Sequence, residues 1–160
     1  MGYEIATCEL AEQRIVSIRE RHPQADLPDY LGKALGELFG RLEVLGVAPA
    51  GGPLVIYHEF GPDSVDAEVC VPIGHDLSTS GEAHTRVLPA MTVARTLHVG
   101  PYDEMGQAYR ALTDWITDRG FEVTGPPQER YLNAPDEVEP AGYRTEVEFP
   151  VVPKAVAVPA

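Results

Sequence analysis

The sequence is short of basic residues and of long apolar runs, and each shortage excludes a class of function. Only 12 Lys and Arg residues stand against 25 Asp and Glu, which gives a formal net charge of −13. Proteins bind nucleic acid largely by neutralising phosphates with Lys and Arg, so this balance disfavours direct nucleic-acid binding. No apolar run approaches the roughly 20 residues of a membrane-spanning helix, and the N-terminus does not resemble a signal peptide. We therefore expect a cytoplasmic protein with no membrane partner.

Motifs for metal, nucleotide and hydrolase chemistry are also missing. The two cysteines, Cys8 and Cys70, stand singly in strand-like segments. This is more typical of small buried residues in a reducing compartment than of a disulfide. The five histidines are scattered, without the spacing of paired metal ligands, and there is no phosphate-binding loop or nucleophile elbow. The sequence predicts neither a metal nor a cofactor.

The sequence does contain an internal repeat. Leu45–Tyr57 aligns with Arg119–Tyr131 at a constant offset of 74 residues. Further along, Ala67–Ile73 aligns with Thr145–Val151 at an offset of 78, so the second half carries four extra loop residues. Several blocks in register, separated by a plausible insertion, indicate a duplication.

The repeat sets the domain organisation that we expect. Residues 1–152 form a single domain, with pseudo-repeats of about 1–80 and 81–152. The polar segment 74–83 is expected to be an exposed linker between the halves. Residues 153–160 hold small residues and prolines, and are expected to form a frayed C-terminal tail.

Each half is predicted to fold as strand, helix, strand, strand. Helices are expected to start at Asp26–Pro28 and at about Tyr102, because apolar residues recur at three- and four-residue spacing up to Gly46 and Gly120, which are suitable helix stops. Two such halves predict an α+β fold, a curved antiparallel sheet with two long helices on one face. A central ligand cleft is expected at the junction of the halves and on the face opposite the helices. The expected strands are Tyr3–Leu10, Glu12–Arg19, Pro53–Glu59, Ser64–Ile73, Thr92–Val99, Pro127–Leu132 and Tyr143–Val151.

Alternation along the strands assigns three carboxylates to this cleft. In Thr145–Val151 the apolar residues are expected to face the helices, so Glu146 and Glu148 point to the other side. Glu68 occupies the repeat position equivalent to Glu146. A strand with one solvated face also alternates apolar and acidic residues, so these glutamates are alternatively ordinary surface residues.

Aromatic residues accompany the candidate carboxylates. Tyr57 and Tyr131 hold equivalent repeat positions, Tyr102 and Trp115 lie elsewhere in the second half, and His98 lies at a strand-to-helix junction. Ring faces beside a carboxylate suit a delocalised organic cation, because the ring quadrupole attracts positive charge. Each aromatic residue is alternatively part of the core, and for Trp115, on a helix, the core interpretation is favoured.

Four segments together resemble the signature of GyrI-like domains. In outline this signature runs G-P-Y, a helix with a tryptophan near its end, Y-L-x-x-P and T-E-[IV]-x-[IV]-P-[IV]. The resemblance extends from about Tyr3 to Val152 and rests on the order and spacing of the motifs. The matching segments are His98–Glu104, Trp115–Gly120, Tyr131–Pro135 and Thr145–Val151.

The resemblance implies a duplicated fold with a central ligand cleft. It also implies kinship with the effector-binding domains of multidrug-responsive transcription activators, which bind lipophilic cations against a buried glutamate. The matching glutamate would be Glu146, with Tyr131 and Tyr102 as neighbours. Those activators carry an N-terminal helix-turn-helix, for which this chain leaves no room before its first strand, so we expect no DNA-binding domain.

The sequence is compatible with three functions. The first is a broad-specificity, multidrug-binding protein with a role in drug resistance, which takes hydrophobic cationic or neutral aromatic small molecules in an acidic, aromatic-lined cleft around Glu146. The second, implied by stand-alone members of the family, is a hydrolase that detoxifies strained reactive natural products, with Glu146 as general acid/base and Tyr131 as its partner. The third, an inhibitor of gyrase or of another protein, ranks last because the acidic charge is spread rather than patterned.

Overall fold

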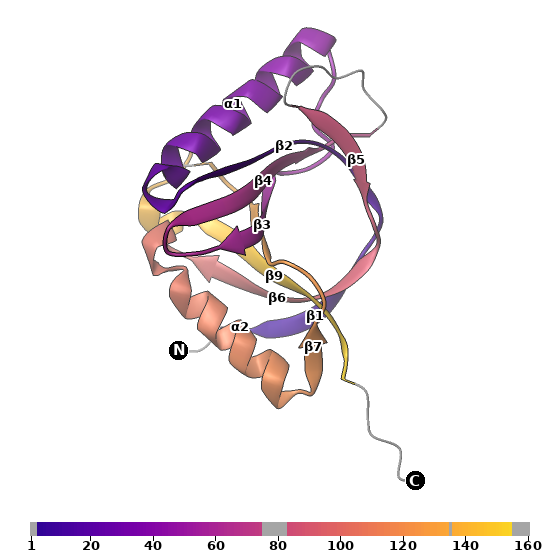
Figure 1. The fold of residues 1–160 in the computed structure, drawn as a ribbon, viewed down its shortest axis with the longest axis vertical. Helices are drawn as coiled ribbons and strands as arrows, with labels where there is room; N and C mark the ends of the chain where they lie inside the picture. Colours follow the sequence, from indigo (N-terminus) through magenta and orange to yellow (C-terminus); the bar gives the residue numbers. More distant parts are fainter. Residues whose placement is uncertain (1–2, 75–82, 135, 155–160) are drawn as a thin grey trace.

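The computed structural model describes residues 3–74, 83–134 and 136–154. One strongly curled antiparallel sheet carries both helices on the same face (Figure 1). The helices are α1 (Leu27–Leu45) and α2 (Gly106–Asp118), with short 3-10 turns η1 (Gln24–Asp26), η2 (Tyr102–Glu104) and η3 (Pro140–Gly142). The strands are β1 (Ile5–Leu10), β2 (Gln13–Pro23), β3 (Leu54–Phe60), β4 (Ser64–Pro72), β5 (His84–Leu88), β6 (Met91–Val99), β7 (Phe121–Val123), β8 (Gln128–Tyr131) and β9 (Arg144–Pro153).

The strand order is symmetric about the centre of the sheet, as a duplication would predict. The strands run β1-β6-β9-β8-β3-β4-β2-β5, and β7 pairs with β9 outside this path. Each strand of the first half has a counterpart at the same distance from the opposite end of this order. Strand β2 corresponds to β6, β4 to β9 and β3 to β8. The outer strands are exchanged, because β1 pairs with β6 of the second half and β5 pairs with β2 of the first. This exchange joins the halves into one sheet, with β3 and β8 paired at its centre.

Helix α1 forms where the apolar spacing predicts it. Asp26 stands at the N-cap without a side-chain capping bond, and Pro28 lies in the first turn, where its missing N–H costs nothing. Gly46 ends the helix at φ 69°, a left-handed conformation that glycine adopts without steric cost. The buried residues of α1 pack on β2, β3 and β4, and they are Tyr30, Ala34, Leu38 and Leu42.

The second helix differs from its prediction at the start. The segment from Tyr102 forms a 3-10 turn, in which the Met105 N–H donates to the Tyr102 carbonyl, and α2 begins only at Gly106. Its buried residues Ala108, Leu112 and Ile116 pack with β6 and β9. The structure therefore confirms the α+β fold, with a curved antiparallel sheet and two helices on one face.

Two short strands were not anticipated. β5 follows the segment expected to be a linker, and β7 has only three residues that pair with the end of β9. Most of the expected linker, residues 75–82, lies outside the described residues, as does 155–160 of the expected tail. β9 runs to Pro153, two residues beyond its predicted end. Among the described residues, neither helix has the length and apolar character needed to cross a membrane.

Candidate ligand-binding groove

A large groove lies between the two helices, on the face of the sheet that they cover. Its volume is about 1050 Å³. Apolar side chains from α1, including Leu31, Leu35 and Phe39, form one wall. Tyr102 of η2, Met105 at the N-cap of α2 and Tyr109 of α2 form another. Strands β3, β8 and β9 supply the floor, so residues from both halves of the duplication line the same space.

Glu129 is the carboxylate on the floor of this groove. It lies on β8 and is only 9% exposed. The hydroxyl of Tyr109 donates to Oε2 at 2.6 Å, and the hydroxyl of Tyr131 donates to Oε1 at 2.9 Å. Each oxygen therefore receives one hydrogen bond, from an aromatic residue that itself lines the groove.

The environment of Glu129 disfavours its charged form. Burial raises the pKa of the Glu129 carboxyl above its ordinary value, and the hydrogen bonds from Tyr109 and Tyr131 and the proximity of His98 only partly oppose this. Burial also raises the pKa values of Tyr109 and Tyr131, so both hydroxyls stay protonated and keep donating. The described lining holds a second carboxylate, Glu137, but neither Lys nor Arg. Within the described lining, the groove therefore has two acidic groups and no basic side chain to pair with them.

Aromatic rings are arranged around the mouth and floor of the groove. Tyr102 stacks on Tyr143 at 4.7 Å between ring centroids and meets Tyr131 edge-on at 5.9 Å. Tyr109 meets Phe149 edge-on at 5.8 Å. Tyr102 is 39% exposed, so this ring remains accessible at the rim. Such rings offer both stacking surface and a negative face to a bound cation.

The structure brings three of the sequence-predicted site residues together. Tyr57, Tyr102 and Tyr131 all line the groove. Tyr57 and Tyr131 come from the two central strands β3 and β8, as their equivalent repeat positions suggested. Their role in ligand binding remains a prediction.

The three predicted carboxylates lie elsewhere, and this corrects the expected geometry. Glu68, Glu146 and Glu148 do not belong to the lining of the groove. The two faces of strand β9 were assigned correctly, because Val147 and Val151 pack against α2. The cleft, however, lies between the helices rather than on the opposite face of the sheet. Residues that point toward the helices therefore line it, and those that alternate with them point away.

On that opposite face the three glutamates form two ion-pair clusters. Glu148 is fully buried and accepts hydrogen bonds from Arg95, Gln128 and Arg130. Glu146 pairs with Arg95 at 3.1 Å between Oε2 and Nε.

Glu68 accepts from Ser17, Arg86 and His58 at 2.6, 2.8 and 2.9 Å. Burial alone would raise its pKa, but these hydrogen bonds, led by that of Arg86, lower the pKa of Glu68 to about 2. The three carboxylates are already matched with protein partners, which makes them components of the sheet rather than free charges.

His98 and Trp115 also lie outside the groove lining. His98 is buried, with Tyr3 at Nδ1 and the Pro101 carbonyl at Nε2, so it ties β6 to the turn that carries Tyr102. Trp115, on α2, stacks on Phe121 at 5.7 Å between ring centroids and packs, partly buried, against the core cluster.

Sequence reasoning missed Glu129, although the repeat carried a signal for it. The offset of 74 that aligns Tyr57 with Tyr131 also aligns Val55 with Glu129. A fully buried valine in one half thus corresponds to a carboxylate in the other. Burying a charged residue at a core position costs folding free energy unless the residue is hydrogen-bonded or paired, so such a residue is a candidate for a functional role.

The fold and the groove together define a small-molecule-binding domain. The sequence model of the GyrI-like small-molecule-binding domain matches residues 3–152, and the chain belongs to this family. No curated protein sequence matches the chain.

Solved structures show the same fold. The EcmrR C-terminal domain is 27% identical, with a TM-score of 0.77 and coverage of 96% of this chain and 99% of that one. EcmrR in its complex with DNA is 28% identical with a TM-score of 0.83, and the match covers 96% of this chain but 58% of that longer chain. SAV2435 bound to tetraphenylphosphonium is 16% identical, with a TM-score of 0.64 and coverage of 95% and 94%.

Proposed function

We propose that this protein binds bulky hydrophobic cations of diverse shape in the groove, with Glu129 as the counter-charge. The observation that carries the proposal is the placement of this one buried carboxylate, held by Tyr109 and Tyr131, on the floor of an otherwise largely apolar cavity. A role in multidrug sequestration follows from the same chemistry.

The physical argument concerns desolvation. A lipophilic cation that enters the groove loses water, and a carboxylate in the same low-dielectric space compensates its charge. Tyrosine rings add cation–π attraction and stacking, which tolerate many ligand shapes because they do not require a fixed pattern of hydrogen bonds. We expect micromolar affinity, about −8 kcal/mol, because a roomy groove gains mainly from stacking and one charge.

The structural neighbours support this choice of ligand. SAV2435, which shares the fold, is solved with tetraphenylphosphonium, a cation of four phenyl groups around a charged centre. The groove in the present chain combines the volume, the rings and the negative charge that such a molecule requires.

The experiment that tests the proposal compares two glutamates on opposite faces of the sheet. Tetraphenylphosphonium binding is measured by calorimetry for the wild type, Glu129→Gln and Glu146→Gln. We expect Glu129→Gln to weaken binding by about tenfold or more, the loss of roughly 1.4 kcal/mol of charge compensation, because Gln keeps an oxygen acceptor for the tyrosines but no charge. Glu146→Gln should bind as the wild type does. The reverse pattern would assign the counter-charge to Glu146, as the family resemblance first implied.

A hydrolase is a second candidate, and one observation favours it. A glutamate whose pKa is raised by burial, with tyrosine hydroxyls on both oxygens, is suited to taking a proton from water as a general base. Mass spectrometry of a strained electrophile in excess over the protein separates the two functions. Multiple turnovers that Glu129→Gln abolishes would establish the enzyme, whereas recovery of unchanged compound supports binding alone.

A further inference from the structure

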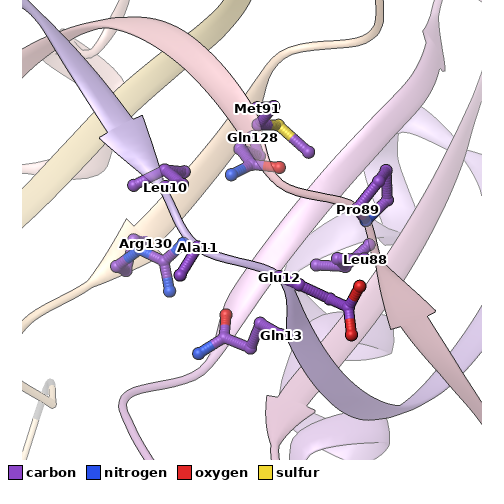
Figure 2. Close-up of a pocket in the computed structure, with 9 residues that line it drawn as sticks. All are labelled: Leu10, Ala11, Glu12, Gln13, Leu88, Pro89, Met91, Gln128 and Arg130. Atoms are coloured by element: carbon purple, nitrogen blue, oxygen red, sulfur yellow. The ribbon is translucent and has the colours of Figure 1, made fainter.

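A second, smaller cavity lies behind the groove, on the other side of strand β8. Its volume is about 260 Å³, and it opens between the β1–β2 connection and the β5–β6 turn (Figure 2). Alternation along β8 separates the two spaces, because Glu129 and Tyr131 line the groove whereas Gln128 and Arg130 line this second cavity. A single short strand therefore forms a wall of both.

Arg130 is the unusual residue of this cavity. Its side chain is only 16% exposed. Among the described residues, its guanidinium makes one long hydrogen bond, 3.5 Å from Nη2 to Oε1 of Glu148, and its buried Nε has no partner. A guanidinium carries five N–H donors, and leaving buried donors unmatched costs free energy. The guanidinium of Arg130, which lines the cavity, thus has N–H donors without a protein acceptor, although the buried Nε itself is closed to solvent.

Glu148 does not fill this need. Its Oε2 is already taken by Arg95, and its Oε1 accepts the amide of Gln128 at 2.8 Å. Arg95 also contacts Glu146, so Arg95 holds both carboxylates of β9 more closely than Arg130 holds either. Arg130 is therefore the guanidinium of this cluster with donors to spare.

The rest of the cavity indicates what kind of molecule would supply the acceptors. Leu10, Leu88 and Met91 give it an apolar wall next to Arg130. Glu12 also belongs to the lining, but it is exposed, and Figure 2 shows its carboxylate extending away from Arg130. Guanidinium groups match carboxylates in geometry and charge, often with two parallel hydrogen bonds.

We propose that this cavity is a second binding site, which takes a small monocarboxylate with a short apolar tail. The carboxylate accepts from the terminal Nη groups of Arg130, and the tail packs on Leu10, Leu88 and Met91. The volume restricts the tail to a short alkyl chain or a single ring. Because the site lies behind β8, it does not depend on the groove's binding of cations, and each can fail without the other.

The test uses hexanoate and its neutral counterpart, hexanamide, with the whole chain. Titration is followed by amide NMR shifts and by calorimetry. Hexanoate is expected to bind in the millimolar range or tighter and to shift the amides of Gln128–Arg130 and Leu88–Met91, while hexanamide binds about tenfold more weakly. Shifts confined to the groove, equal binding of acid and amide, or no binding of hexanoate would each overturn the proposal.

Three variants locate the site. Arg130→Gln should reduce hexanoate affinity by about tenfold or more through loss of the charged donor. Arg130→Gln also removes the ion pair with Glu148, so a second variant is needed that leaves this pair intact. Ala11→Trp serves this purpose, because Ala11 lines the cavity from the exposed β1–β2 connection and a large ring there would fill it. Arg19→Gln, which alters a surface arginine paired with Asp66, is the matched control and should bind as the wild type. Wild-type affinity in both Arg130→Gln and Ala11→Trp would place the carboxylate elsewhere.

Discussion

Val55 and Glu129 face each other across the pairing of β3 with β8, at the centre of the sheet. They are also equivalent positions of the two repeats, since the offset of 74 relates them. The pseudo-symmetry of the fold thus places one apolar and one acidic residue side by side on the floor of the groove, and both line it. The symmetric strand arrangement is therefore asymmetric in charge at this point of the groove floor.

Cation binding should depend on the protonation of Glu129. Burial raises the pKa of its carboxyl, so protonation at falling pH removes the counter-charge earlier than it would for an exposed glutamate. We expect tetraphenylphosphonium affinity to be constant above this raised pKa and to weaken as the pH falls through it. Calorimetry over a pH series measures this. Glu129→Gln should give weak binding with no such dependence, and an unchanged slope in that variant would assign the titration to another group.

Tyr109→Phe should move this pH dependence upward. The Tyr109 hydroxyl donates to Oε2 of Glu129 at 2.6 Å, and a hydrogen bond to the ionised form stabilises it. Loss of the donor raises the pKa of Glu129 further, so the affinity should begin to fall at a higher pH. The same pH series on Tyr109→Phe checks this. A midpoint at the wild-type pH or below it would contradict the account, and Tyr30→Phe, which alters a buried tyrosine away from the groove lining, serves as control.

Glu68, unlike Glu129, has a lowered pKa, so its ionised form should stabilise the folded protein. Hydrogen bonds from Arg86, Ser17 and His58 lower the pKa of Glu68 to about 2. A carboxyl with a lowered pKa in the folded state contributes stability that is present above its unfolded pKa and is lost as the pH falls toward the folded value. Glu68→Gln should therefore lower the free energy of unfolding at neutral pH by about 3 kcal/mol, with the difference shrinking between about pH 4.5 and 2.

Urea unfolding at several pH values measures the Glu68 effect. Glu59→Gln, which breaks an exposed pair with Arg21, is the control and should change stability little. A loss for Glu68→Gln no larger than that of the control would show that the cluster does not stabilise the fold.

Alanine substitution should have opposite effects on stability at two glycines, one inside α1 and one at its C-cap. Gly46 has φ 69° at the C-cap, where a Cβ is strained, so Gly46→Ala should cost about 1 kcal/mol. Gly36 lies inside the helix with open space around its Cα, so Gly36→Ala should stabilise by about 0.5–1 kcal/mol. Melting temperatures of the two variants test this pair, and a shift of the same sign for both would refute the assignment.

The sequence determines some of these features more strongly than others. Helix α1 and its end at Gly46 follow from local spacing and backbone geometry, and the strand faces follow from alternation, so both could be predicted. Alternation along β9 places Glu146 and Glu148 on one face of the sheet and Val147 and Phe149 on the other. It does not determine which of the two faces borders a cavity. That depends on how far apart the two helices pack, which is a tertiary property.

Strand β5 was not predicted, because it too depends on tertiary structure. Its pairing with β2 is made across the two halves, and no local pattern encodes it. Glu129 was not predicted because β8 has only four residues, which are too few to show from alternation which side chains face the helices.

The most direct measurement compares two ions of the same shape and opposite charge. Tetraphenylphosphonium and tetraphenylborate both carry four phenyl groups on a central atom, so apolar burial and stacking are nearly equal for the two. We predict that the wild type binds the cation at least about tenfold more tightly than the anion, and that Glu129→Gln removes most of this preference. Equal affinity of the wild-type protein for the two ions would contradict the assignment of Glu129 as the counter-charge of the groove.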